Sequence, residues 1–207
     1  MKKFVARKFF ALFSFAIAAL ALSAAQRVQP TYQNGDIILQ TSLSSQSEAI
    51  QLATHSQWTH VAIVFFQGAT PYVYEAEGPV GFRLLSAFIA SGAGGEYLLR
   101  RVPGGLSTAQ VQSLYTVGQG FYGLPYDPYF DWSDNAMYCS ELVWKMYDRA
   151  LNISVGTLQQ LKDFDLSSPQ VQAILAERYG SNIPYDETVV SPAAIAESAN
   201  LVTVYQN

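Results

Sequence analysis

Two strand-like runs joined by a short turn place the strongest constraint on how this chain can fold. Residues 58–66 are rich in β-branched and aromatic side chains, and residues 72–77 follow after the turn residues 67–70 and Pro71. Runs of this kind, separated by a few turn residues, are typical of an antiparallel β-hairpin. We therefore expect an antiparallel sheet that contains this hairpin.

The register of the hairpin decides which acidic side chain lies beside His60. If residues 68–69 form the loop, which is the register we prefer, His60 is opposite Glu77; if residues 67–68 form it, His60 is opposite Glu75. Side chains alternate between faces along a strand, so Glu75 and Glu77 share one face. Both registers predict a histidine–carboxylate pair on adjacent strands. The alternative is a structural histidine with two ordinary edge charges.

The only cysteine, Cys139, opens a stretch with the periodicity of an amphipathic helix. Apolar residues follow it at the spacing of one helical face, namely Leu142, Val143, Met146, Tyr147 and Ala150. We expect Ser133, Asp134 or Asn135 to cap this helix. Free N–H groups and the positive end of the helix dipole favour a thiolate in the first turn and can also hold an oxyanion. The alternative is a buried structural cysteine.

Residues 1–25 have the pattern of a cleaved secretory signal peptide. A basic start is followed by an apolar run over residues 9–22 and a small-residue cleavage site at residues 23–25. The run is shorter than the roughly 20 residues that a membrane-spanning helix needs. We expect residues 26–207 to form a single exported domain, periplasmic or secreted, with no stable membrane anchor after cleavage.

Charge and cysteine content narrow the function classes. Removal of residues 1–25 takes away four basic and no acidic residues, so the net charge of −4 becomes −8. An acidic chain without a Lys/Arg cluster is not expected to bind nucleic acid or anionic lipid surfaces. One cysteine forms no internal disulfide, and with His55 and His60 it gives no closed metal-ligand set, so we expect no metal and no other cofactor.

The rest of the chain alternates short strands and helices, which favours an α+β fold. Ser45 and Glu48 have the spacing of a capping box for a helix that ends near His55, and Ser107 with Gln110 has the same spacing. We further expect strands at residues 37–40, 97–102 and 201–205, and helices at 84–90, 168–180 and 191–200. The aromatic loop 129–132 could floor a cleft beside the thiol or close the core.

His60, an acidic residue and Cys139 are the side-chain types that cysteine hydrolases use. Such enzymes need a thiolate nucleophile, a histidine that shares and later donates the proton, and a polar group that orients the histidine. Cys139 would attack an amide or ester, and His60 would protonate the leaving group and then activate water. We interpret His55 as a helix C-terminal cap or a group that supports the site.

Several motifs in this order resemble the circularly permuted papain-like amidases of the YiiX/YaeF type, which are related to the NlpC-type cell-wall cysteine peptidases. The matching pieces are GDI at 35–37, ATHS at 53–56, HV at 60–61, YEA at 74–76, GLPYD at 123–127, YCSELV at 138–143 and SP at 191–192. The resemblance implies a permuted papain-like fold in which an antiparallel sheet packs against the helix that bears the nucleophile.

The resemblance assigns roles to four residues. Cys139 corresponds to the nucleophile, His60 to the base and Glu75 to the orienting acid, because Glu75 fills the aromatic-Glu-Ala position. Tyr126 corresponds to a tyrosine that lines the substrate or oxyanion site. This choice of acid goes against the register in which Glu77 is opposite His60.

Three functions follow as hypotheses. The first is an exported cysteine hydrolase that cleaves amide bonds, with peptidoglycan stem peptides as the substrate that its compartment and the resemblance favour. The second is a hydrolase or acyltransferase for lipid or fatty-acyl amides, which a large apolar tunnel beside Cys139 would favour. The third is a non-catalytic protein that binds a cell-wall or lipid ligand in the cleft.

Overall fold

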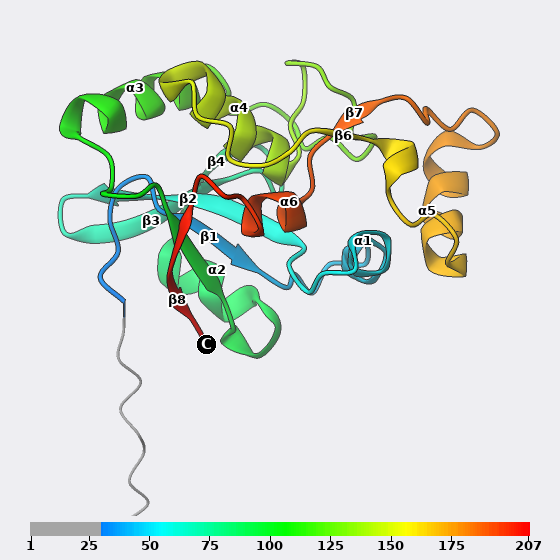
Figure 1. Cartoon of the computed structure of the whole chain (residues 1–207), viewed down its shortest axis with the longest axis horizontal. Helices are drawn as coiled ribbons and strands as arrows, with labels where there is room; N and C mark the ends of the chain where they lie inside the picture. The colour runs from blue at the N-terminus through cyan, green and yellow to red at the C-terminus, as the bar shows by residue number, and fades with distance from the viewer. Residues whose placement is uncertain (1–29) are drawn as a thin grey trace, which may run out of the picture.

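The computed structural model describes residues 30–207, and its centre is a six-stranded antiparallel sheet (Figure 1). The expected signal peptide lies outside these residues. The strand order is β4 (Gly81–Leu84), β3 (Thr70–Glu75), β2 (His60–Gln67), β1 (Ile37–Gln40), β5 (Leu98–Arg101) and β8 (Val202–Gln206). Neighbouring strands run antiparallel throughout. A separate two-stranded ladder joins β6 (Gln159–Gln160) and β7 (Thr188–Val189).

Helices cover both faces of this sheet, as Figure 1 shows. On one face lie α3 (Thr108–Gln119) and α4 (Cys139–Leu151), and on the other lies α2 (Leu85–Ser91). The remaining helices are α1 (Ser47–Thr54), α5 (Pro169–Tyr179), α6 (Pro192–Ala196) and the short 3₁₀ turns η1 (Ala93–Gly95) and η2 (Leu161–Asp163). None of the helices in residues 30–207 has both the length and the apolar character needed to span a membrane.

The alternation of side chains along β1 and β2 divides the core between the two faces. Val61 and Ile63 pack in one buried cluster with the apolar face of α4, including Leu142 and Met146. Ala62 and Val64 pack in the other cluster with α2. Strands buried on both faces explain why residues 61–66 form a continuous apolar run. The predicted α+β fold, with a sheet packed against the cysteine helix, is confirmed.

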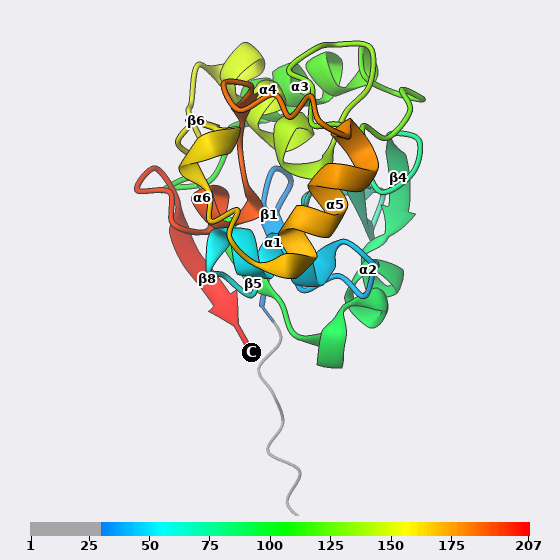
Figure 2. The ribbon, with the colours of Figure 1, turned by 90° about the vertical axis from the view of Figure 1, so that its right-hand side faces the viewer.

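A third apolar cluster lies beyond one end of the sheet, where α1 and α5 pack side by side (Figure 2). It joins Ala49 of α1, Leu161 of η2, and Val171 and Leu175 of α5. The aliphatic residues of this cluster form part of the cavity described below.

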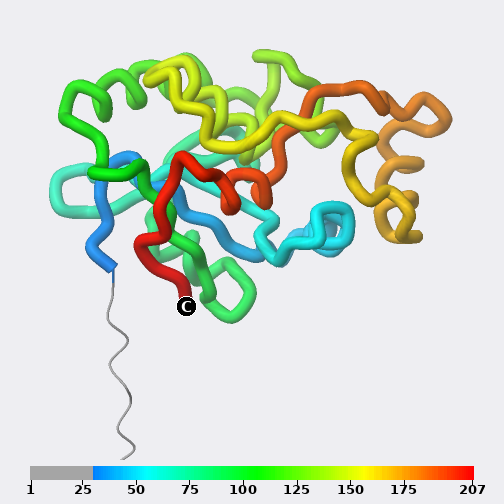
Figure 3. The backbone as a smooth tube through the Cα atoms, in the orientation of Figure 1, coloured from blue at the N-terminus to red at the C-terminus, as the bar shows by residue number. Residues whose placement is uncertain are grey.

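The first described residues and the C-terminus lie at the same end of the molecule (Figure 3). Tyr97 joins them, since its hydroxyl bonds that of Tyr32 at 2.6 Å and its backbone N–H donates to the Asn207 side chain at 2.8 Å. The expected C-terminal strand is confirmed as β8, which covers the edge of β5.

Two predicted helix starts are wrong. Ser45 does not cap α1: the N-cap is Gln46, which makes no capping bond because its side chain bonds Tyr126 and Arg178 instead. Ser133, Asp134 and Asn135 do not cap α4.

The N-cap of α4 is Tyr138, whose backbone N–H donates to Glu141 Oε2 at 3.3 Å. Asp134 instead forms ion pairs with Lys145 and Arg149. The expected helix from residue 191 is also shorter than predicted, because α6 ends at Ala196 and the carbonyls of Ser198 and Leu201 accept hydrogen bonds from Arg100.

Candidate active site

Cys139 is the first residue of α4, as its position in the sequence predicted. Tyr138 before it is extended, so the chain enters the helix at the cysteine. The thiol is free and only 6% of the residue is exposed. Because the first N–H groups of a helix lack partners within the helix, the sulfur lies at the electropositive end of α4.

His60 and Glu75 form the histidine–carboxylate pair that the hairpin predicted. His60 begins β2 and Glu75 ends β3, and their Nε2 and Oε2 atoms are 2.7 Å apart in a buried setting. Thr70 is opposite Gln67, so the preferred loop at residues 68–69 is confirmed. In that register Glu77 would be opposite His60, but the pairing of β3 with β2 ends at Tyr74, so Glu75 reaches His60 diagonally instead.

Arg83 of β4 holds Glu75 from the other side. Its Nε atom lies 2.6 Å from Glu75 Oε1, and its Nη1 atom lies 2.8 Å from Glu77 Oε2. The guanidinium also lies over the Phe88 ring, which stacks on His60 at 5.5 Å between ring centroids. Sequence reasoning missed Arg83 because it did not predict β4. Arg83 thus holds Glu75 in place and also forms an ion pair with Glu77.

Two opposing effects set the protonation of His60. Burial disfavours the imidazolium, but interactions with Cys139 and Glu75 outweigh it and raise the pKa of His60 to about 10. The histidine is therefore positively charged at neutral pH. A cation beside the sulfur is the setting in which cysteine nucleophiles are activated.

His60, Glu75 and Glu77 are also close enough to share a metal ion. Their ligand atoms lie within 4.8 Å of one another, the one such group found in the described part of the chain. Arg83, however, contacts both carboxylates. The guanidinium of Arg83 already supplies the positive charge that a metal ion would bring to these two carboxylates. The residues therefore fit an ion-pair network better than a metal centre.

Tyr126 lies in the same cavity wall as Cys139. Its hydroxyl accepts a 2.7 Å hydrogen bond from Gln46 Nε2, and Gln46 Oε1 accepts one of 2.6 Å from Arg178 Nη2. Burial and the charge of Cys139 raise the pKa of Tyr126, so the phenol stays neutral. Gln46 and Arg178 escaped sequence reasoning, because they lie 132 positions apart and no motif joins them.

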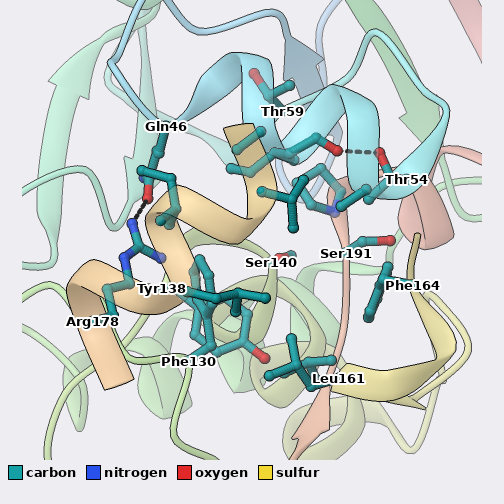
Figure 4. Close-up of a pocket in the computed structure, with 18 of the residues that line it drawn as sticks. Gln46, Thr54, Thr59, Phe130, Tyr138, Ser140, Leu161, Phe164, Arg178 and Ser191 are labelled. Atoms are coloured by element: carbon teal, nitrogen blue, oxygen red, sulfur yellow. Dashed lines mark hydrogen bonds between the residues drawn. The ribbon is translucent and has the colours of Figure 1, made fainter. Parts of the chain in front are cut away.

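The cavity beside Cys139 has a volume of about 110 Å³. Figure 4 shows Leu161 and Phe164 on one side of the cavity, and Phe130 on the other side near the hydrogen-bonded Gln46–Arg178 pair. Both expectations for the aromatic loop hold, since Phe130 lines the cavity while Trp132 packs against Trp144 of the core.

His55 lies away from this site. It is the C-cap of α1 in the left-handed conformation, with φ of 51°, and its largely exposed side chain lies 3.2 Å from Asp165. The expectation of a helix-end residue is confirmed.

Comparison with known proteins identifies the chain's relatives. Residues 31–205 match the family described as "Permuted papain-like amidase enzyme, YaeF/YiiX, C92 family". Uncharacterized protein YiiX of Escherichia coli (strain K12) is 55% identical over 172 residues, which cover 83% of this chain and 85% of YiiX. The crystal structure of metalloprotein yiiX from Escherichia coli O157:H7 is similar with a TM-score of 0.83 and 53% identity, covering 84% of this chain and 97% of that one. The chain therefore belongs to the family of permuted papain-like amidases.

Proposed function

We propose that this protein is a cysteine hydrolase of amide bonds in which Cys139 is the nucleophile, His60 the acid and base, and Glu75 the group that orients His60. The observation that carries the proposal is that the buried His60 contacts Glu75 at 2.7 Å and also interacts with Cys139, which lies at a helix N-terminus. Membership of an amidase family supports the bond class.

The proposed reaction uses these groups in two steps. Cys139 Sγ attacks the acyl carbon, the C–N bond breaks, and His60 gives its proton to the departing nitrogen. Water then attacks the thioester while His60 takes a proton from it, which releases the carboxylic acid and the thiol. Glu75, held by Arg83, keeps the imidazole oriented, and the Tyr126 hydroxyl contacts the substrate beside the sulfur.

Hydrolysis of butyryl p-nitroanilide, together with the more reactive p-nitrophenyl butyrate, tests this proposal. We expect Cys139→Ala and His60→Ala each to lower kcat/KM by at least about 10³-fold, because each removes a reacting group. Intact mass spectrometry of the wild type should show one butyryl group on Cys139. Turnover that survives Cys139→Ala would contradict the assignment.

A metal-dependent mechanism has less support. The Escherichia coli O157:H7 relative is described as a metalloprotein. In this chain the histidine–carboxylate group that could hold a metal is occupied by Arg83, so no step above uses one. We expect turnover to be unchanged after treatment with a chelator. A loss of activity that a divalent metal restores would overturn this account.

Export and a peptidoglycan substrate belong to the proposal as inferences from the sequence. The basic and apolar pattern of residues 1–25 supports export, and export together with the family resemblance supports stem peptides as substrates. Mass spectrometry of the periplasmic fraction tests the first point, since the mature chain should begin at Gln26.

A non-catalytic binding protein is the alternative from another class. It requires an unreactive Cys139 and ligand affinity that survives Cys139→Ala. The charged His60 beside the thiol favours the hydrolase, since a binding cleft has no need of a group that activates sulfur.

A further inference from the structure

Gln46, at the start of α1, links Tyr126 to Arg178 of α5 by two hydrogen bonds. Gln46 Nε2 donates to the Tyr126 hydroxyl at 2.7 Å, and Arg178 Nη2 donates to Gln46 Oε1 at 2.6 Å. Figure 4 shows the bond between Gln46 and Arg178, which joins the two helices. The two steps of the proposed reaction use Tyr126 but give no role to Gln46 or Arg178.

Arg178 determines which atoms donate and which accept along these bonds. A guanidinium only donates hydrogen bonds, so the atom of Gln46 that faces Arg178 must be the amide oxygen. The amide nitrogen of Gln46 then faces Tyr126, and the phenol oxygen accepts its N–H. The reverse orientation of the amide would place two donors against each other. Tyr126 therefore keeps its own O–H proton for another acceptor.

The cavity shared with Cys139 provides a place for that proton. Among residues 30–207, Gln46 is the one hydrogen-bond partner of the Tyr126 hydroxyl. Tyr126 and Cys139 line the same cavity, and the pKa of Tyr126 is raised by burial and by the charge of Cys139. A neutral phenol in this position can donate to an oxygen that becomes negative beside the sulfur.

The backbone holds Tyr126 beside the segment that leads into α4. The Asp127 N–H donates to the Met137 carbonyl at 3.0 Å, and the Met137 N–H donates to the Pro125 carbonyl at 3.0 Å. These bonds flank Tyr126 on both sides, and Met137 lies two residues before Cys139. The tyrosine and the nucleophile are therefore positioned by the same short segment.

Gln46 and Arg178 are held in place as well. The hydroxyl of Ser47, next to Gln46, shares a 2.8 Å hydrogen bond with that of Thr59, just before β2. Arg178 lies over the Phe130 ring, 4.9 Å from its centroid. Donors that are already in position stabilise a developing charge without reorganising during the reaction.

We propose that Gln46 and Arg178 are positioning residues that turn the Tyr126 hydroxyl toward the oxyanion of the acyl-transfer steps. The inference rests on the proposed function, because the oxyanion forms when Cys139 or water adds to the acyl carbon. As the new bond to carbon forms, the π electrons of the C=O bond move to oxygen, and the Tyr126 O–H donates a hydrogen bond to it. When the C=O bond forms again and the leaving group departs, Tyr126 still has its proton.

Gln46→Glu tests the direction of these bonds with little change of shape. A carboxylate only accepts, so it pairs with Arg178 and also takes the Tyr126 proton. We expect kcat for p-nitrophenyl butyrate to fall about tenfold or more while KM stays within about threefold, because the oxyanion is absent from bound substrate. Tyr126→Phe, which removes the donor, should lower kcat by about 10²-fold.

Matched variants control for charge and for folding. Gln172→Glu adds the same charge on the exposed side of α5 and should change neither kcat nor KM. If Gln46→Glu does not fold, Gln46→Met replaces it, because loss of the amide also leaves the hydroxyl without orientation. Arg178→Lys keeps a donor for the Gln46 oxygen and should retain more of kcat than Arg178→Met.

A double-mutant cycle separates this role from a structural one. In the Tyr126→Phe background, Gln46→Glu should cause less than about a twofold further loss of kcat, since the hydroxyl that it misdirects is gone. The same loss from Gln46→Glu in both backgrounds would overturn the proposal, because Gln46 would then act without Tyr126.

Two reactions of Cys139 distinguish failure of this inference from failure of the proposed function. Alkylation by iodoacetamide forms no oxyanion, so Gln46→Glu should react within about threefold of the wild-type rate. Butanal accepts the S–H across its C=O bond and gives a tetrahedral hemithioacetal, whose oxygen takes the place of the oxyanion. We expect butanal to protect Cys139 from iodoacetamide about tenfold less well in Gln46→Glu than in the wild type.

The two possible failures then give different results. If the wild type cleaves no ester or amide but the difference in protection by butanal is found, the proposed function fails and the role of Gln46 stands. If the wild type cleaves the ester through Cys139 and Gln46→Glu has an unchanged kcat, the role of Gln46 fails and the proposed function stands.

Discussion

Glu75 is held between two cations, and this arrangement makes its charge testable. Glu75→Gln keeps the shape of the side chain but weakens its hold on both His60 and Arg83. In serine hydrolases, replacing the orienting acid by its amide lowers kcat by about 10⁴-fold. We expect Glu75→Gln to lower kcat/KM for p-nitrophenyl butyrate by about 10²-fold or more, as measured by initial rates.

Glu77→Gln is the matched control for this change. Glu77 also contacts Arg83, but it is half-exposed, with 45% of its side chain accessible, and makes no hydrogen bond to His60. We expect its kcat/KM to stay within about threefold of the wild type. Equal losses in the two variants would contradict the assignment of Glu75.

At the level of single residues, the sequence predicted the candidate site residues that belong to a recognisable local pattern, such as a hairpin turn or a helix start. The turn at residues 68–69 predicted the register, but choosing Glu75 over Glu77 needed the family resemblance, because the diagonal reach depends on where the β2–β3 pairing ends. Arg83 could not be found in this way, because residues 77–81 read as turns and concealed the strand that carries it.

Helix α3 has the capping box that its sequence predicted, and α1 lacks the one predicted for it. Ser107 Oγ accepts from the Gln110 N–H at 3.3 Å, whereas Ser45 is exposed and lies before the Gln46 N-cap. We expect Ser107→Ala to lower the free energy of unfolding by about 1 kcal/mol. Ser45→Ala should change it by less than about 0.5 kcal/mol.

Urea denaturation of both variants measures these differences. A larger loss for Ser45→Ala than for Ser107→Ala would show that the helix starts are assigned incorrectly.

Local signals located the helices well and their ends less well. Ser168 caps α5 and Gly180 ends it, as predicted, because both termini are specified by adjacent residues. The start of α1 was missed since Gln46 is engaged by Tyr126 and Arg178, which are far away in sequence. Tertiary contacts of this kind override a local capping pattern.

In the folded protein, His60 of the sheet interacts with Cys139 at the start of α4. This interaction makes the free energy of unfolding of the protein depend on pH. The pKa of His60 is raised from 6.5 to about 10 in the folded protein, so the charged imidazole stabilises the fold. This contribution is fully present below pH 6.5 and is lost as the pH rises toward about 10. The proton on His60 therefore affects both the candidate active site and the stability of the fold.

Urea unfolding of the wild type and of His60→Gln over this range checks the linkage. We expect the free-energy difference between the two proteins to be largest below pH 6.5 and to shrink steadily up to about pH 10. A difference that stays constant or grows with pH would contradict the raised pKa of His60.

The overall arrangement was the most predictable part of the molecule. Alternating apolar runs and the order of motifs predicted an antiparallel sheet against the cysteine helix, and the structure has both. For the cavity, the sequence predicted only that an aromatic loop could lie beside the thiol. Its wall comes from α1, α5 and residues 189–192, which no local pattern places together.

The pH dependence of Cys139 alkylation by iodoacetamide tests the central assignment most directly. In the folded wild type we expect rapid alkylation to persist at mildly acidic pH, because His60 remains charged beside the sulfur. His60→Ala should lose this acidic reactivity by about tenfold or more, and Glu75→Ala should lose part of it. A thiol that reacts only after unfolding, or that responds to pH identically in all three proteins, would contradict the assignment of Cys139 as an activated nucleophile.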